Sequence, residues 1–582
     1  MILQHSIDLA SALLATCVAV FCLLSWGQLT LRVLGINPDT IQIHHAWIGL
    51  TSILGIANLA QIFLPITWHI SLAFLLIATL NAYYYRNSWQ DLLALLKRSV
   101  LHHPLLSFVT CLAIFCLSSG ALLAPGNYDS GLYHFTTIAW LNQHPITLGL
   151  GNLHGRLAFN QSYFSAVALL NVYPLWNKGY SIAGPLLIYL GFASIAFGGL
   201  EKIRLGLYLQ IAFFFLIASL CTDISAPTPD LAISVLQIVI FAQLIWLSYQ
   251  KYEGVLLKPT QMIAFACMCF LICTMKLSGI VFGMSALCLM AWIHTASICH
   301  QSSPLKRALG LLIIFACIHL LRSTLLSGAP LYPAPILSMS WLDWAIPINT
   351  IQNELNWTYS WARRPGYDIK AVLGNWNWFI PWLKALPISA WLCGIITSIS
   401  LPWYFYSKHK RSSNSQARLT YTDNAFIYST LFPLLPLLPL FMGILFWFLT
   451  APDLRFLGVL HQLLAIYSVW LVWGQKSIGT PNHQPNNLHD NGMLSTQLTA
   501  YGLIGAVFVA STLQVLRPKI FSGYEPLPLI ETKPLQTQSG TVIYTPVNGE
   551  QCGNENLPCT PYFNPKIKEG RLYEWWIIYS VQ

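Results

Sequence analysis

The sequence predicts an all-α transmembrane protein, a polytopic helical bundle of about fourteen spans. Three observations support this class: 55% of the 582 residues are hydrophobic, the mean hydropathy is +0.57, and only 9% of the residues are charged. Apolar stretches of about twenty residues, the length that crosses the hydrocarbon core of a bilayer, recur along the chain. Such a composition excludes an ordinary soluble domain.

Hydropathy places the spans and divides the chain into regions. The predicted spans lie at about 7–27, 45–64, 66–85, 104–123, 182–199, 204–221, 230–249, 259–275, 277–297, 307–323, 386–407, 424–449, 456–474 and 498–516. They form N-terminal extra spans in 1–103, a core in 104–323 with an external loop 124–180, an external Trp-rich loop 324–385, C-terminal spans in 386–516 and an external tail 517–582.

Basic loops predict the orientation of these spans. The net charge of +10 would indicate nucleic-acid binding in a soluble domain, but here Lys and Arg fall mostly in short loops. Cytoplasmic loops are enriched in Lys and Arg, so the basic connector 86–103 and the KHKR run at 408–411 are expected in the cytoplasm. The loop 124–180 is then external. We expect a lipid bilayer as a partner and no nucleic acid.

Whether one apolar stretch crosses the membrane decides on which side every later loop lies. Residues 165–180 are too short to cross a bilayer and are interrupted by Asn171, Pro174 and Lys178. We therefore predict an interfacial helix there rather than a span. The basic run EKIR that joins the next two spans then falls on the cytoplasmic side.

Most of the polar chemistry of the chain gathers in the segment 125–164. Within about forty residues it contains Asp129, His134, His144, His154 and Arg156, in a chain with few charges. We interpret it as a water-facing loop. The same topology brings further charged residues from separate loops to the external face, which predicts one polar site there. They are Asp223, Asp230, Lys276, Arg322, Asp453 and Arg455.

The acidic residues are candidates for catalysis. Asp129, close to the end of a span and beside aromatic residues, is suited to accept a proton or to bind a cation; the alternative is an Asp that caps its own loop. Asp223 is a candidate second acid. Asp230 is another, although an acidic residue at the start of a helix also has a structural explanation. If a divalent cation is a cofactor, Asp129 and Asp223 are its expected ligands.

The basic and polar candidates suit an anionic substrate. Arginine binds phosphate oxygens with a bidentate fork, so His134, His154, Arg156 and Asn160 are candidate phosphate ligands, with metal binding or plain surface polarity as alternatives. Lys276, Arg322 and the pair Asp453 and Arg455 are further candidates for substrate binding; the alternative for the basic members is snorkelling to the interface. The tryptophans of 324–385 either form an interfacial belt or stack against sugar rings.

Cysteines supply little chemistry. Twelve of the fourteen lie in or beside apolar runs, where Cys behaves as a small hydrophobe. Cys552 and Cys559 lie in a polar tail and can form a disulfide if that tail is in an oxidising compartment. The sequence has no Walker loop and no glycine-rich dinucleotide fingerprint.

The arrangement resembles the GT-C glycosyltransferase superfamily. An acidic external loop after an early span, two spans joined inside and a second acidic turn outside are similar to that pattern. The motifs GNYDSGLYH, GNLHGR, SAPTPD, SGAPLYP and APDLRF also look like those of a largely uncharacterised bacterial family of multi-pass membrane proteins. The chain departs from the GT-C pattern in having Asp129 followed by Ser130 rather than a second acid, and in its three extra N-terminal spans.

The resemblance implies a function. It implies a membrane glycosyltransferase that moves a sugar from a polyprenyl-phosphate-linked donor to a glycan, lipid or protein acceptor at the external face of a bacterial inner membrane. By the same resemblance Asp129 is the base or metal ligand, and Asp223 or Asp230 is the second acid. Two alternatives are a transporter or flippase of a lipid-linked glycan, whose charges would line a pathway through the bilayer, and an assembly subunit without a cleft.

Overall fold

The computed structural model is mostly helical. It describes residues 2–102, 104–203, 206–300, 302–414, 431–474, 524–525, 527–553, 556–572 and 575–580. The predicted span 498–516 and the predicted cytoplasmic loop 476–497 lie outside the described residues.

The helices follow one another with short connections. The N-terminal region has α1 (Ile2–Val33), α2 (His44–Phe63), α3 (Trp68–Tyr84) and α4 (Arg86–His102). The core has α5 (Pro104–Gly120), the π-helix η1 (Ser130–His134), α6 (Phe135–Gln143), η2 (Leu150–Asn152), η3 (Gly155–Ala158), α7 (Ser162–Leu170), α8 (Tyr180–Ala196), η4 (Leu200–Lys202), α9 (Gly206–Ser219), η5 (Leu220–Asp223), α10 (Pro229–Tyr252), α11 (Pro259–Met275), η6 (Leu277–Gly279), α12 (Ile280–Ile293), α13 (Thr295–His300) and α14 (Ser302–Ser327). The later part has α15 (Ile348–Arg363), α16 (Ile369–Val372), α17 (Phe379–Ala385), α18 (Ile388–Asn414), η7 (Phe432–Leu434), α20 (Leu437–Thr450), α21 (Leu454–Leu457) and α22 (Leu460–Gly474).

Several of these helices suit a lipid bilayer. Within the described residues, 7 helical segments are long and apolar enough to cross a membrane: Leu3–Val33, His44–Phe63, Gly206–Asp223, Pro229–Tyr252, Ser302–Ser327, Ile388–Lys410 and Phe432–Thr450. Shorter apolar helices lie at Trp68–Tyr84, Thr110–Gly120, Tyr180–Ala196, Pro259–Met275, Leu277–Ile293 and Leu460–Trp473. Each predicted span up to residue 474 thus overlaps an apolar helix, although the start of the predicted span 424–449, residues 424–430, lies outside the described residues. The total number of crossings stays a prediction.

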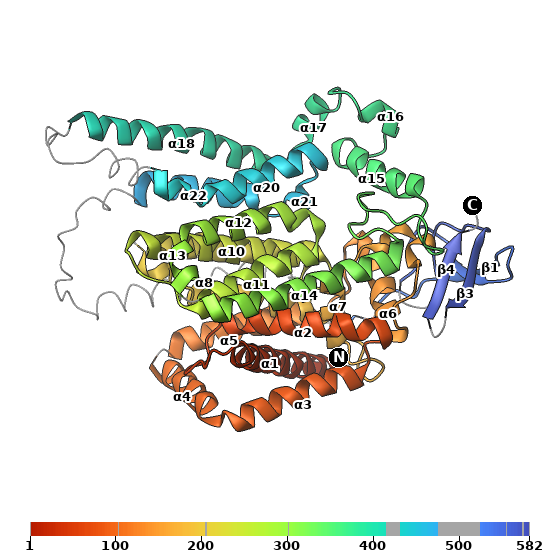
Figure 1. Cartoon of the computed structure of the whole chain (residues 1–582), viewed down its shortest axis with the longest axis horizontal. Coiled ribbons are helices and arrows are strands. Elements are labelled where there is room, and N and C mark those ends of the chain that lie inside the picture. The colour runs from red at the N-terminus through yellow and green to blue at the C-terminus, as the bar shows by residue number, and fades with distance from the viewer. Residues whose placement is uncertain are drawn as a thin grey trace.

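Helix α10 lies at the centre of the bundle. It packs against α8, α11 and α12, and 94% of its most apolar window is buried. Its start is specified locally, because Pro229 occupies the first turn and the Thr228 hydroxyl accepts a hydrogen bond from the backbone N–H of Asp230 at 3.3 Å. The bundle helices run side by side, with the C-terminal strands at one end and α13 towards the other (Figure 1).

The predicted interfacial helix at 165–180 is wrong in its extent. Helix α7 ends at Leu170, and Tyr163 and Phe164 are buried in the bundle. The helix ends there because the Asn171 side chain accepts a hydrogen bond from the backbone N–H of Gly179 at 2.8 Å, which turns the chain towards α8. The prediction that this stretch contains no long spanning helix agrees with the structure.

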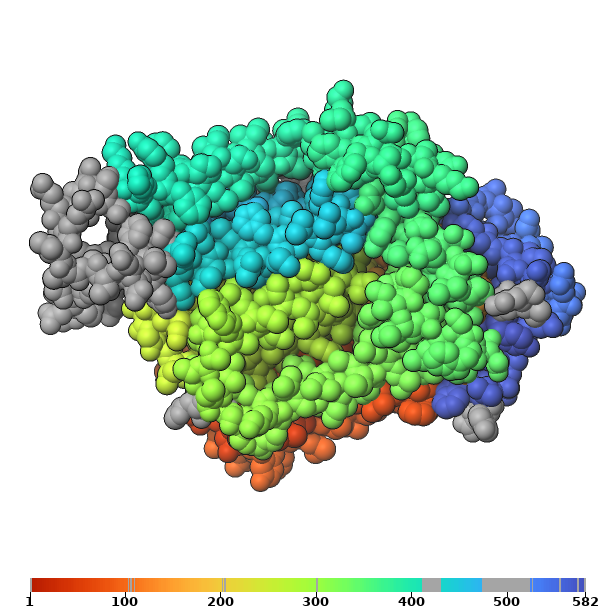
Figure 2. Space-filling model, turned by 45° about the horizontal axis from the view of Figure 1, so that its top comes forward, coloured from red at the N-terminus to blue at the C-terminus, as the bar shows by residue number. Residues whose placement is uncertain are grey.

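The C-terminal tail contains β-structure that the sequence did not predict. Strand β1 (Thr532–Gln536) pairs antiparallel with β2 (Val542–Pro546), and β3 (Ile567–Leu572) pairs antiparallel with β4 (Trp575–Ser580). Cys552 and Cys559 form a disulfide. Short strands of five or six residues carry little hydropathy signal, so an expectation built on spans missed them. In Figure 2 these strands (blue) lie beside the green segment that holds α15.

Candidate functional site

Asp129 stands immediately before the π-helix η1. Its backbone N–H donates a hydrogen bond to the Asn127 side-chain oxygen at 2.9 Å, an Asx turn that fixes the loop before the helix begins. The Asp129 carboxylate is not used as a cap and is free to face other elements. The alternative of a loop-capping Asp129 is therefore not what the structure shows.

Two arginines hold this carboxylate. Arg156 Nη1 lies 3.3 Å from Asp129 Oδ1, and Arg455 Nη1 lies 3.3 Å from Asp129 Oδ2. The side chain of Arg156 is 15% exposed, whereas that of Arg455 is 47% exposed. Asp129 thus joins η3 to the short helix α21, which is remote in sequence.

A second ion pair stands beside the first. Lys276 Nζ contacts Asp230 Oδ1 at the start of α10. Arg455 also contacts Asp453, whose carboxylate caps α21, and its electrostatic neighbours include both Asp129 and Asp230. We call the set Asp129, Arg156, Asp230, Lys276, Asp453 and Arg455 the charged cluster. Asp223, exposed at the end of η5, interacts electrostatically with Asp230 and borders it.

Aromatic rings surround the charged cluster. The Arg156 guanidinium lies 5.0 Å from the ring centre of Trp357 and 5.8 Å from that of Tyr133. Lys276 Nζ lies 4.7 Å from the ring centre of Phe456. These cation–π contacts hold the cations in place while leaving their N–H groups available to acceptors. The Trp-rich segment therefore contributes directly to the site through Trp357 on α15.

His134 lies behind the charged cluster rather than in it. Its side chain is 1% exposed and packs against Phe164. Burial, followed by the charges of Lys276 and Arg156, lowers the pKa of His134 well below its usual value. His134 is therefore neutral at physiological pH and supports the cluster as a buried polar residue. Burial likewise raises the pKa of the neighbouring Tyr133.

His154 contacts the C-terminal tail. Its ring packs edge-on against Tyr562 with the ring centres 5.3 Å apart. Burial, and then the charge of Arg156, lower the pKa of His154 to about 3. A neutral, 6% exposed imidazole is poorly suited to neutralise a phosphate, so the structure favours a packing role for His154.

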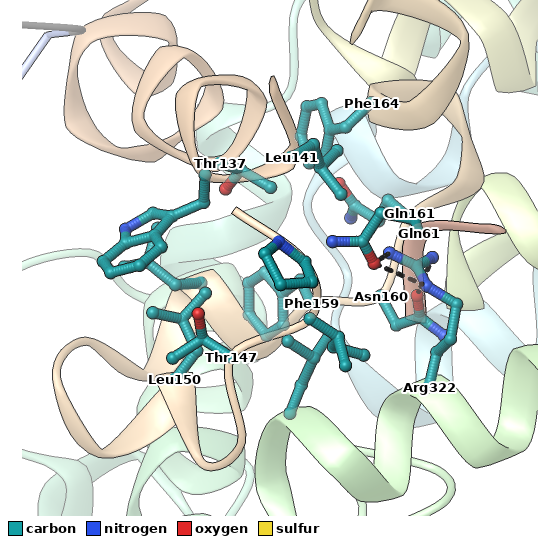
Figure 3. Close-up of a pocket in the computed structure, with 15 residues that line it drawn as sticks. Gln61, Thr137, Leu141, Thr147, Leu150, Phe159, Asn160, Gln161, Phe164 and Arg322 are labelled. Atoms are coloured by element: carbon teal, nitrogen blue, oxygen red, sulfur yellow. Dashed lines mark hydrogen bonds between the residues drawn. The ribbon is translucent and has the colours of Figure 1, made fainter. Parts of the chain in front are cut away.

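Arg322 and Asn160 form a separate polar centre. Arg322 is 3% exposed, and its guanidinium donates to Asn58, Gln61 and Asn160 at 2.9 to 3.3 Å. Among the described residues no carboxylate forms an ion pair with Arg322. Figure 3 shows Arg322, Gln61 and Asn160 at the edge of a cavity of about 30 Å³, room for one or two water molecules. Both residues were expected in one site with Asp129, but the structure puts them in this buried centre.

Sequence reasoning missed Glu354 and Tyr332. The Glu354 carboxylate interacts with Arg156, and burial raises its pKa while Arg156 opposes the shift. Tyr332 interacts with both residues. Gly155 permits this approach, because a methyl group at that position would lie 2.8 Å from the Tyr332 hydroxyl. Tyr332 belongs to the SGAPLYP motif and Glu354 to the amphipathic helix α15. Neither sequence pattern predicts that the two residues lie beside Arg156.

The C-terminal tail covers the loop that carries Asp129. The Gln551 side chain donates to the backbone oxygen of Tyr128 at 2.9 Å, and the backbone N–H of Gly553 donates to the backbone oxygen of Gly131 at 2.9 Å. The Thr136 hydroxyl donates to the Gly553 oxygen at 2.8 Å. The disulfide that begins at Cys552 therefore constrains the segment that docks next to Asp129.

The arrangement offers no ready metal site. No group of three or more His, Cys, Asp or Glu side chains with metal-binding geometry occurs in the part of the chain that the structure describes. Both oxygens of Asp129 already face arginines, against which a divalent cation would have to compete.

One family matches this chain. Residues 10–461 match a family described as Domain of unknown function (DUF8201). The chain belongs to this family. The match includes every member of the charged cluster, whereas the C-terminal strands lie beyond it. No curated protein and no solved structure matches the chain. Membership of the DUF8201 family therefore assigns no activity.

Proposed function

We propose that the protein is a GT-C-type membrane glycosyltransferase that moves a sugar from a polyprenyl-phosphate donor to an acceptor hydroxyl at the external face of a bacterial cell membrane. The observation that supports this is the charged cluster. It gathers one carboxylate between two arginines and a second carboxylate with a lysine, from loops far apart in the sequence.

The reaction requires two opposite electrostatic functions. The acceptor hydroxyl is a weak nucleophile and must lose its proton as it attacks the anomeric carbon. The bond between that carbon and the phosphate oxygen breaks, and the lipid phosphate leaves with the electron pair. A carboxylate that takes the proton contributes about 10² to 10⁴ in rate. Cations next to the leaving phosphate stabilise its developing charge.

The ion pairs suggest how the two functions are linked. In the described residues Asp129 forms an ion pair with both Arg156 and Arg455. A phosphate that binds these arginines replaces the Asp129 carboxylate as their acceptor, since guanidinium groups bind phosphate oxygens well. Asp129 is then released to accept the proton of the acceptor. Donor binding in this scheme activates the base, and Lys276 supplies a third cation.

Replacement of the base tests the proposal. Asp129→Asn keeps the size of the side chain and removes its charge, so we expect product formation to fall by at least about 10²-fold with normal protein level. The assay is mass spectrometry of acceptor glycans and lipid-linked donor in cells that express each variant. Asp91→Asn, an exposed acid on α4, is the matched control.

The same assay separates the proposal from transport. A transferase without its base leaves the acceptor unglycosylated while the lipid-linked donor accumulates. A weakened flippase also leaves acceptor unglycosylated, but its lipid-linked donor accumulates on the cytoplasmic side, where an impermeant hydrolase added outside cannot reach it. The donor that a transferase without its base leaves behind is on the external side and is cleaved. Wild-type glycans in the Asp129→Asn variant would remove Asp129 from catalysis and would contradict the proposed enzyme.

A further inference from the structure

A second cavity lies at the other end of the bundle from the charged cluster. It has a volume of about 640 Å³, within the range of about 300 to 1,000 Å³ that small-molecule sites occupy. Helix α10 connects the two sites, because Asp230 is in its first turn and Trp246 and Gln250 line the cavity near its other end. At 1.5 Å per residue, about 24 to 30 Å separates them.

The lining of this cavity combines cations with polar groups. Lys202 and Lys258 line it and outnumber Asp39, the acidic residue of the lining. Lys202 Nζ lies 5.7 Å from the ring centre of Trp246, and the backbone N–H of Lys258 donates to the side-chain oxygen of Gln261, another lining residue, at 3.1 Å. Both lysines are exposed.

The surroundings of the cavity add positive charge and an unused polar atom. Arg32 Nη1 donates to the side-chain oxygen of Asn37, a lining residue, at 3.2 Å. The Arg307 guanidinium lies beside Gly35 in the adjacent loop. The side-chain oxygen Oε1 of Gln250 is buried in the lining, and none of the residues that the structure describes donates a hydrogen bond to it. Buried polar atoms normally have a partner, so a ligand with a hydroxyl or amine group fits this position.

The rim of the cavity is apolar. Phe197 is 77% exposed, Leu256 is 57% exposed and Val255 is 47% exposed, and all three belong to the lining. Exposed apolar side chains next to lysines at the end of a helical bundle are typical of a surface that faces lipid headgroups and the first part of their chains.

From these contacts we propose that the cavity binds a phosphate-bearing headgroup of an anionic lipid. Lys202 and Lys258 hold the phosphate, Gln250 Oε1 accepts a hydrogen bond from a headgroup hydroxyl, and Phe197, Val255 and Leu256 contact the acyl chains. Gly199 shapes the site: its φ of +98° and its contact with the Trp246 ring, where a methyl group would lie 2.5 Å away, let the Lys202 turn lie against that ring. The inference does not depend on the proposed transferase activity.

Native mass spectrometry of the purified full-length chain, titrated with phosphatidylglycerol, measures this binding. The double variant Lys202→Gln/Lys258→Gln should bind about 25-fold more weakly, about fivefold for each lysine near a lipid phosphate. Thr260→Trp fills the lined space and leaves the lysines in place, so it should also reduce binding. Lys97→Gln on α4 removes the same charge away from the lining and should bind as the wild type does.

The outcomes separate the possible sources of the phosphate. Binding of phosphatidylglycerol that phosphatidylcholine does not reproduce supports the lipid headgroup. If inorganic phosphate binds by itself and displaces the lipid at a similar concentration, the cavity is a phosphate site whose ligand is soluble. Equal lipid binding by wild type and the double lysine variant overturns the proposal. If the double lysine variant loses lipid binding but Thr260→Trp does not, the lipid binds through surface charge and not in the cavity, which also overturns the proposal.

Discussion

Asp129 and Arg455 form an ion pair of 3.3 Å across 326 residues of sequence. This contact connects the loop after α5 to the helix α21, so it ties the first half of the bundle to the second. Arg156 completes the arrangement from a position only 27 residues after Asp129. The charged cluster is thus assembled from one local contact and one remote contact.

The two arginines should differ in their coupling to Asp129. Exposed ion pairs contribute about 0 to 1 kcal/mol, because water screens them. We expect a coupling energy in that range for Asp129 and the 47% exposed Arg455, and a larger one, about 1 to 3 kcal/mol, for the 15% exposed Arg156. Double-mutant cycles of Asp129→Asn with Arg156→Gln or Arg455→Gln, read by unfolding in detergent, measure both. A larger coupling for Arg455 would contradict this order.

Acid should weaken the packing between His154 and the tail. The pKa of His154 is lowered to about 3 in the folded protein, whereas an unfolded histidine titrates near its usual 6.5. Between these values the unfolded chain binds a proton that the folded chain does not, so stability falls as the pH falls from about 6.5 towards 3. The cost is at most about 1.4 kcal/mol per pH unit.

His154→Phe tests this dependence because phenylalanine keeps an aromatic contact with Tyr562 and does not titrate. Amide exchange of residues 556–572 as a function of pH should lose part of its acid sensitivity in the variant. The same variant of the exposed His69 serves as the control. An unchanged pH profile in His154→Phe would assign the acid sensitivity to other buried histidines, such as His134.

The disulfide should hold the tail against the Asp129 loop. In the loop-closure account, a ring closed over a separation of 7 residues stabilises by about 2.5 kcal/mol. Cys552→Ser should therefore increase amide exchange at Gly131 and Thr136, where Gly553 docks, and leave α10 unaffected. Cys393→Ser, which alters a free thiol, is the matched control. Unchanged exchange at Gly131 would mean that the docking does not need the disulfide.

Arg322 should contribute to the stability of the fold and not to the surface charge. Its removal takes away the donor that the side-chain oxygens of Gln61 and Asn160 have in the described structure, whereas Asn58 keeps a hydrogen bond from the Ser165 hydroxyl. Arg322→Met should lower the free energy of unfolding by about 2 to 4 kcal/mol, whereas Arg307→Met, an exposed position on the same helix α14, should change it by less than about 0.5 kcal/mol. Thermal unfolding in detergent compares the two. Similar values for both would contradict the buried role.

The orientation also stays a prediction that can be measured. An accessible cysteine at Tyr367 should react with an impermeant reagent from outside the cell, and one at Lys97 should react only from inside, because basic loops remain in the cytoplasm. Both positions are exposed. The labelling needs a background in which the exposed native cysteines are replaced. Labelling of Tyr367→Cys only from inside would reverse the topology.

Hydropathy predicted the helices well because each span is a local property of about twenty residues. The convergence of Asp129, Asp230, Lys276 and Arg455 also followed from topology, since loops on one side of a bundle end near one another. The position of Arg322 did not follow, because its burial depends on Asn58 and Gln61 of α2, which face it across the bundle.

The contacts of the tail were out of reach for a different reason. Gln551 and Tyr128 are 423 residues apart, and no periodicity in either segment predicts that they meet. Glu354 was missed because a lone acid in a Trp-rich loop has no spacing that marks it. Pairing of Cys552 with Cys559 was recognised in advance because it is a local feature of the sequence.

The long separation between Asp129 and Arg455 has a consequence for biosynthesis. A ribosome that adds about 5 to 20 residues per second needs about 15 to 65 s to proceed from one residue to the other. During that interval Asp129 has Arg156 as its partner, while α21 and the tail have yet to be made. The nascent chain therefore passes through the membrane-insertion machinery with a half-assembled cluster, and the last ion pair forms only after nearly all of the helices have been inserted.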